Sequence, residues 1–162
     1  MSKMYLAVLA ALTLVPAAAG AQVLQERTMP LAIAQELAQA TVEACAAKKF
    51  NVTATVVDRA GLVRAVLRAD GAGPHTVEAS RAKAYTAASA RTTTTAIMEN
   101  ADKNPAARHL AAIDGFLLLG GGVPVKAADE VIGAVGVGGA PGGHLDEECA
   151  NAGLAKIQAK LK

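Results

Sequence analysis

Hydrophobic positions along the chain follow two repeats, one typical of helices and one typical of strands. Between residues 29 and 49, apolar side chains recur at three- and four-residue steps, which indicates a helix with one buried face. Residues 51–58 and 62–67 are rich in β-branched side chains and flank a turn that contains Gly61, so they predict a β-hairpin. After a glycine-containing loop, Thr76 is the expected N-cap of a second helix.

The second half of the pattern predicts further strands and a final helix. Four consecutive threonines, at residues 92–95, disfavour a long helix there. The remaining elements are expected as a short helix at 106–113, strands at 115–119, 123–127 and 131–137, and a last helix at 144–161. The order α-ββ-α-(α)-βββ-α predicts an α+β fold with a five-stranded antiparallel sheet covered by helices. The strands at 115–119 and 131–137 are almost wholly apolar, so both are expected to be central in the sheet.

The first 21 residues have the pattern of a Sec-type signal peptide. Lys3 is followed by an apolar run at residues 6–15, and Ala19 and Ala21 supply the small side chains before a cleavage site. A helix of ten residues rises only about 15 Å, so the run is too short to cross a hydrocarbon core of about 30 Å. We expect cleavage after Ala21, a single domain at residues 22–162, and a periplasmic or secreted protein.

Composition narrows the class of protein further. Hydrophobic residues make up 52% of the chain and charged residues 19%, which favours a folded core over intrinsic disorder. Lys and Arg number 16 against 14 Asp and Glu, and their dispersal argues against nucleic-acid binding. The two cysteines, Cys45 and Cys149, exclude a disulfide-dense scaffold. An exported protein permits a disulfide between them, and two buried thiols are the alternative.

Several motifs occur together, in one order, over most of the chain after residue 21. They are residues 57–61 (VDRAG), 70–76 (DGAGPHT) with 80–87 (SRAKAYTA), 120–125 (GGGVPV), and 131–143 (VIGAVGVGGAPGG) followed by 146–150 (DEECA). Together they resemble the GlcG/HbpS family of haem-binding-like proteins. They are also similar to the C-terminal domain of PduO-type corrinoid adenosyltransferases.

This resemblance implies a fold similar to profilin and roadblock domains, and a homo-oligomer. It also implies haem as the cofactor, because members of the family include an extracellular haem-binding partner of a sensor kinase. Other members are encoded in glycolate operons, so function varies across the family.

Haem binding calls for an axial ligand, an apolar slot and cations for the two propionates. His75 is the leading candidate for the iron ligand, because Pro74 restricts the backbone beside it. His144, which stands where the family more often has an acidic residue, is a second candidate. Arg64 and Arg68 are four apart on a strand and are expected to share a face. The candidate cofactor-binding residues are therefore His75, Arg64, Arg68, Arg81 and Tyr85.

Three functions stay open at this point. The first is an exported haem- or tetrapyrrole-binding protein for haem sensing, sequestration or transport. The second is a GlcG-like metabolic accessory or enzyme that acts on a small organic acid. The third is a cofactor-free oligomeric partner of a sensor protein. The chain has no Walker A, G-x-S-x-G, H-E-x-x-H or C-x-x-C motif, so the sequence favours a binding protein over an enzyme and predicts no catalytic residue.

Overall fold

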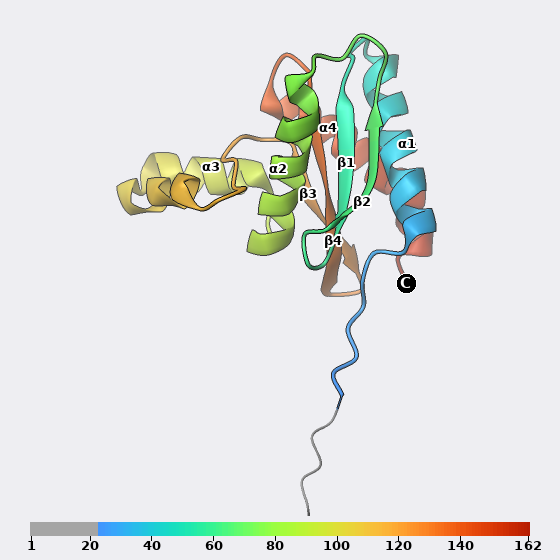
Figure 1. Ribbon diagram of the computed structural model, residues 1–162, viewed down its shortest axis with the longest axis horizontal. Coiled ribbons are helices and arrows are strands. Elements are labelled where there is room, and N and C mark those ends of the chain that lie inside the picture. The colour runs from blue at the N-terminus through green and yellow to red at the C-terminus, as the bar shows by residue number, and fades with distance from the viewer. Residues whose placement is uncertain (1–22) are drawn as a thin grey trace, which may run out of the picture.

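The computed structural model describes residues 23–162, and these residues form helices packed on both faces of an antiparallel sheet (Figure 1). The helices are α1 (Leu31–Ala47), α2 (His75–Ala90), α3 (Thr94–Lys103) and α4 (Gly143–Ile157), with 3-10 helices η1 (Pro105–Ala112) and η2 (Gln158–Lys160). The strands are β1 (Thr53–Asp58), β2 (Val63–Arg68), β3 (Gly122–Ala127) and β4 (Glu130–Gly138). The expected signal peptide lies outside the described residues, so its cleavage stays a prediction.

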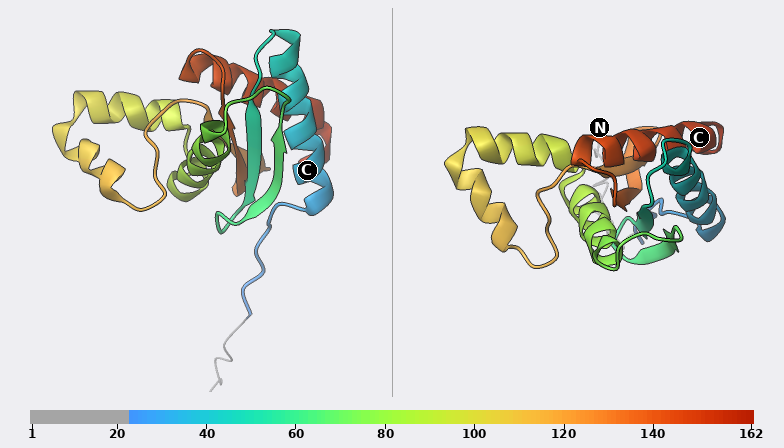
Figure 2. Two further views of the ribbon diagram at one scale, coloured as in Figure 1. Left: turned by 45° about the horizontal axis from the view of Figure 1, so that its top comes forward. Right: turned by 90° about the horizontal axis from the view of Figure 1, so that it is seen from above.

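The sheet has the order β2-β1-β4-β3, with every neighbouring pair antiparallel. Helix α2 lies across one face, while α1 and α4 lie side by side on the other (Figures 1 and 2). The predicted α+β class and the hairpin of β1 and β2 are therefore confirmed. None of the helices in residues 23–162 is long and apolar enough to cross a membrane.

The prediction of five strands is wrong, because the apolar segment at residues 115–119 is not a strand. Gly115 has a φ of +84°, and the backbone N–H of Leu117 donates to the Thr86 hydroxyl at 2.9 Å instead of to a neighbouring strand. Leu119 is 43% exposed, so the segment is not central in the sheet either. The chain rejoins the sheet only at Gly122, where β3 begins.

Helix α2 lies very close to the sheet because the strands beneath it carry glycine. A Cβ atom at Gly136 would lie 2.1 Å from the carbonyl oxygen of Ser80, and one at Gly122 would lie 2.4 Å from that of Lys83. Both distances are far shorter than real Cβ contacts, so any side chain at either glycine would push α2 away. The interface is completed by small side chains, including that of Ala84.

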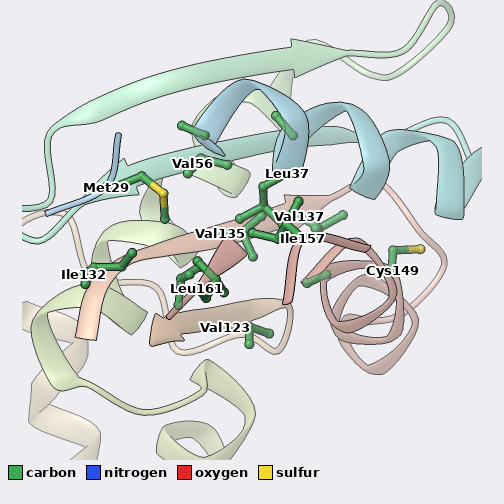
Figure 3. Packing of buried hydrophobic residues seen from close by; sticks show 14 of the residues in the cluster. Met29, Leu37, Val56, Val123, Ile132, Val135, Val137, Cys149, Ile157 and Leu161 are labelled. Carbon is green, nitrogen blue, oxygen red and sulfur yellow. The ribbon is translucent and has the colours of Figure 1, made fainter. Parts of the chain in front are cut away.

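The larger apolar core fills the space between the sheet and the two helices on its other face. Leu37 of α1, Val56 of β1, Val135 of β4 and Ile157 of α4 are fully buried there, and Figure 3 shows their side chains converging. Aliphatic residues build this core, in line with the shortage of aromatic residues in the sequence.

Residues 91–112 form a helical arm that projects away from the sheet (Figures 1 and 2). Arg91 ends α2 in a left-handed conformation, and the hydroxyl of Thr93 caps α3 by accepting from the N–H of Ala96. The threonine run therefore starts a ten-residue helix that the sequence did not predict. The short helix expected at 106–113 is present as the 3-10 helix η1.

A disulfide joins Cys45 of α1 to Cys149 of α4, with a Cα–Cα distance of 5.3 Å. Both cysteines are fully buried where the two helices pack together. The bond settles the choice that the sequence left open.

Replacing both cysteines by alanine is expected to lower the free energy of unfolding, because the disulfide closes a chain segment with a separation of 104 residues. The loss of loop-closure restraint corresponds to about 4 to 5 kcal/mol for a loop of this size. Urea denaturation monitored by circular dichroism measures the difference, with wild type denatured in reductant as the control. If the double variant loses stability but reduced wild type does not, the loss comes from the altered packing of the two side chains and the disulfide contributes little.

Candidate functional site

The start of α2 is fixed to β1 by a pair of hydroxyl contacts. The hydroxyls of Thr53 and Thr76 lie 2.6 Å apart, and those of Thr55 and Ser80 lie 2.7 Å apart. The expected N-cap role of Thr76 is wrong, because its hydroxyl donates to the carbonyl of Gly73 and lies inside the helix, which begins one residue earlier. These contacts align α2 along β1, so that β2 lies beside the helix on the same sheet.

Strand β2 presents Val66 and Arg68 on the face that α2 covers. In the register, Arg68 is opposite Thr53 and Val66 is opposite Thr55, and both threonines contact α2. Residues directly opposite in an antiparallel pair share a face, so Val66 and Arg68 lie on the α2 side. Val66 is 43% exposed there, because β2 is the edge strand and α2 covers mainly β1 and β4.

Arg64 is separated from this face by a register shift in β2. Val56 is opposite Ala65 while Val57 is opposite Val63, so the alternation between faces is interrupted at Arg64. Arg64 instead lines a shallow concave surface of about 430 Å³ between β2 and α1. No ion pair of Arg64 is present within residues 23–162.

Arg68 and Arg81 already have partners. The guanidinium of Arg68 donates through Nε to the carbonyl oxygen of Ala72 at 2.9 Å, which holds the loop before α2. Arg81 donates to the Glu78 carboxylate at 2.5 Å, one turn earlier on the same helix. The Arg81–Glu78 pair is exposed to solvent and weak enough to be exchanged for another anion, whereas Arg68 holds a neutral carbonyl oxygen in a partly buried contact.

His75 is the first residue of α2 and is exposed to solvent. A Cβ at Gly73 would lie 2.7 Å from its Cε1 atom, so the imidazole folds back over a residue without a side chain. In the described part of the chain the ring makes no hydrogen bond. The imidazole nitrogens are therefore accessible to an external ligand.

Tyr85 packs as part of the structure near the far end of α2. Its ring lies against Gly61 of the hairpin turn and against Gly115, and it meets the Phe116 ring edge-on with centroids 6.1 Å apart. A Cβ at Gly61 would lie 2.6 Å from the Tyr85 ring. The structure thus places Tyr85 and His75 near opposite ends of α2.

The other histidines lie on different surfaces. His144, in the first turn of α4, is exposed beside Glu147 and Glu148 in a concave surface of about 220 Å³. Both carboxylates have partners there, since Glu147 accepts from Thr95 and Glu148 pairs with Lys48 at 2.5 Å. His109 is exposed on η1. Residues 23–162 contain no group of three or more His, Cys, Asp or Glu side chains that could hold a metal ion.

A buried ion pair beneath α2 was missed by the sequence analysis. Lys83 is 1% exposed, and its ammonium donates to Asp146 of α4 at 2.7 Å and to the carbonyl oxygen of Val137 at 2.9 Å. The second carboxylate oxygen of Asp146 accepts from the N–H of Ala140 at 3.0 Å. Lys83 follows Ser80 by one helical turn, and this spacing was the signal that it faces the sheet.

Burial raises the pKa of the Asp146 carboxyl above its ordinary value. The hydrogen bond and positive charge of Lys83, and the N–H of Ala140, act in the opposite direction. The pair is therefore held by several directed contacts rather than by charge alone, as buried ion pairs require.

Comparison with known proteins identifies the family. The family described as "Haem degrading protein HbpS-like" matches residues 29–155, which include α1 to α3, all four strands and most of α4. The chain belongs to the HbpS-like family. Among curated proteins, none matches the chain in sequence.

Solved structures of HbpS-like proteins share both fold and sequence with this chain. A double mutant of Streptomyces reticuli HbpS is 37% identical, with a TM-score of 0.80 over 90% of this chain and 97% of that one. Klebsiella pneumoniae ORFY is 30% identical, with a TM-score of 0.80 over 85% and 96% of the two chains. A PduOC:heme complex, at 22% identity and a TM-score of 0.72 over 80% and 95%, shares the fold.

Removing either member of the buried pair is expected to destabilise the protein by about 3 to 5 kcal/mol, because the other charge is left buried without its partner. Lys83→Met and Asp146→Leu test this in urea denaturation. The double variant is expected to recover most of the loss, because both charges are then absent. Single losses within about 1 kcal/mol of wild type, the range of an exposed pair, would contradict the prediction.

Proposed function

We propose that this HbpS-like protein binds haem, with His75 as a ligand of the iron. Membership of a family described as haem-degrading supports the ligand class. A relative of the same fold has been solved as a heme complex, which shows that the fold accommodates the group in that protein. The observation that carries the proposal is the imidazole of His75, which is exposed and free of hydrogen bonds within residues 23–162.

The residues around the start of α2 fit what haem requires. His75 stands at the N-terminus of α2, where its exposed imidazole can reach an external ligand. Val66 and Val77 are exposed apolar side chains on β2 and α2, respectively, and are suited to the apolar part of a porphyrin. When bound, haem supplies an iron centre whose reactivity depends on its axial ligand and the polarity around it.

The cations differ in how readily they would bind a propionate. Arg64 has no ion pair within the described residues, but it lines the surface between β2 and α1 and would have to reach around the edge strand to a propionate beside His75. Arg68 would have to exchange its contact with the loop before α2, and Arg81 its contact with the neighbouring carboxylate. The ring of Tyr85 is held between Gly61 and Gly115, so any contribution of Tyr85 to cofactor binding would be to hold the hairpin turn against α2. His144 is the weaker iron candidate because the carboxylates of Glu147 and Glu148 lie beside it and would repel the propionates of haem.

We further propose that the protein is exported and acts as a homo-oligomer in haem sensing, sequestration or transport. The pattern of residues 1–21 supports export to the periplasm or the medium. Exposed apolar side chains on the edge strand β2 support self-association, because a copy of the chain could cover them. Light scattering at micromolar concentration tests the assembly, and a monomer would refute it.

Replacing His75 by alanine is expected to shift the Soret maximum of the haemin-loaded protein and to weaken haemin binding at least tenfold, about 1.4 kcal/mol. The reason is the loss of the imidazole that would hold the iron, while the fold stays intact because His75 is exposed. Absorption titration with haemin measures the effect, and circular dichroism checks the fold.

His109→Ala and His144→Ala are the matched controls, because both remove an exposed imidazole elsewhere on the surface. They are expected to change the spectrum less than His75→Ala does. If His75→Ala leaves spectrum and affinity unchanged while a control abolishes binding, the ligand assignment is wrong. If haemin produces no Soret change in wild type, saturable binding of a small carboxylate would favour the metabolic alternative.

The exported protein is expected to begin at Gln22, because cleavage follows Ala21. Intact mass spectrometry of protein expressed with the full sequence and recovered from the periplasm measures the new terminus. A recovered chain that still begins at Met1 would refute the signal-peptide assignment.

A further inference from the structure

A concave surface of about 510 Å³ lies at the end of the sheet where the β1–β2 and β3–β4 turns meet. Its charged lining consists of Arg27, Arg59, Arg91, Lys126, Asp129 and Glu130. These residues come from segments far apart in the sequence: the stretch before α1, the hairpin turn, the end of α2, and the β3–β4 hairpin. The surface is separate from His75, because α2 begins at the opposite end of β1.

The charges on this surface do not balance. Arg59 is neutralised by its contact with Glu130, and a carboxylate oxygen of Glu26 lies 3.6 Å from its second terminal nitrogen. The other three cations, Arg27, Arg91 and Lys126, form no ion pair within residues 23–162. Two carboxylates remain to set against them, Asp129 of the lining and Glu26, whose contact with Arg59 is the longer of the two. Three cations around one concavity repel one another, and an anion that reached all of them would relieve this repulsion.

Two residues of the lining have unusual backbone conformations. Arg91 has a φ of 57° and Ala128 a φ of 51°, although neither is a glycine. Arg91 is the C-cap of α2 and Ala128 lies in the two-residue turn between β3 and β4, and both kinds of position commonly adopt this conformation. At Arg91 this conformation ends α2, and the chain turns there beside the concave surface that Arg91 lines.

We propose that this surface binds a small oxyanion with two or more negative charges, such as a dicarboxylate, a tricarboxylate or a phosphorylated metabolite. Three cations of the lining that form no ion pair within residues 23–162 supply the contacts that such a ligand needs. Two of the three cations are arginines, whose planar guanidinium groups bind carboxylate and phosphate oxygens in a bidentate manner. The site does not depend on haem binding.

The test uses the haem-free protein and isothermal titration calorimetry with citrate and with pyrophosphate. Acetate at the same ionic strength is the reference, because general screening acts equally for all three. Arg91→Asn removes the charge and keeps a residue type that tolerates the left-handed conformation. Lys126→Gln removes a second cation from an exposed position on β3. Lys103→Gln removes an exposed cation from α3 and is the matched control.

Citrate, pyrophosphate or both are expected to bind more tightly than acetate, and whichever binds tightly identifies carboxylate or phosphate as the preferred group. Arg91→Asn and Lys126→Gln are each expected to weaken that binding at least tenfold, while Lys103→Gln leaves it unchanged. The proposal is overturned if neither multivalent anion binds better than acetate, or if the two site variants bind as wild type does. It is also overturned if Lys103→Gln weakens binding as much as they do, since the effect would then follow net charge alone.

Discussion

The buried contact between Lys83 and Asp146 connects the layers on the two faces of the sheet. Lys83 belongs to the helix on one face of the sheet, and Asp146 belongs to a helix on the other face. Their contact passes the edge of the sheet at Gly121, where a Cβ atom would lie 2.6 Å from Cβ of Asp146. Since an ammonium buried without its carboxylate is unfavourable, α2, β3 and α4 must assemble together. Gly122 and Gly136 beneath α2 permit this close approach, because a Cβ atom at either position would clash with the helix backbone.

The sequence predicted those parts of the fold in which hydrophobic residues follow a regular helical or strand spacing. The first helix, the β1–β2 hairpin and the last helix follow regular repeats and lie within a few residues of their expected bounds. Residues 115–119 have the apolar composition of a buried strand, yet contacts with Tyr85 and Thr86 hold them outside the sheet. Tertiary contacts of this kind leave no trace in local periodicity. The helix at Thr94–Lys103 escapes prediction because a threonine run disfavours a helix interior, whereas Thr93 acts as its cap.

The candidate site was predictable as a set of residue types but not as an arrangement. Pro74 stands directly before α2 and His75 is exposed, while the role of His75 as a ligand stays a prediction. The register shift that separates Arg64 from Arg68 cannot be read from the sequence, because the bulge depends on how two strands pair. The concave basic surface was also beyond sequence reasoning, since its cations come from segments that only the folded chain brings together.

The disulfide turns most of the chain into a covalent ring. Cys45 and Cys149 enclose all four strands together with the helical arm of residues 91–112. The arm contacts little of the sheet, which leaves it open to proteolysis (Figure 1). Because the disulfide brackets the arm, a single cut there would break the backbone without separating the two halves. In an oxidising compartment the nicked molecule would still migrate as one species, and it would come apart into two fragments only when unfolded with reductant.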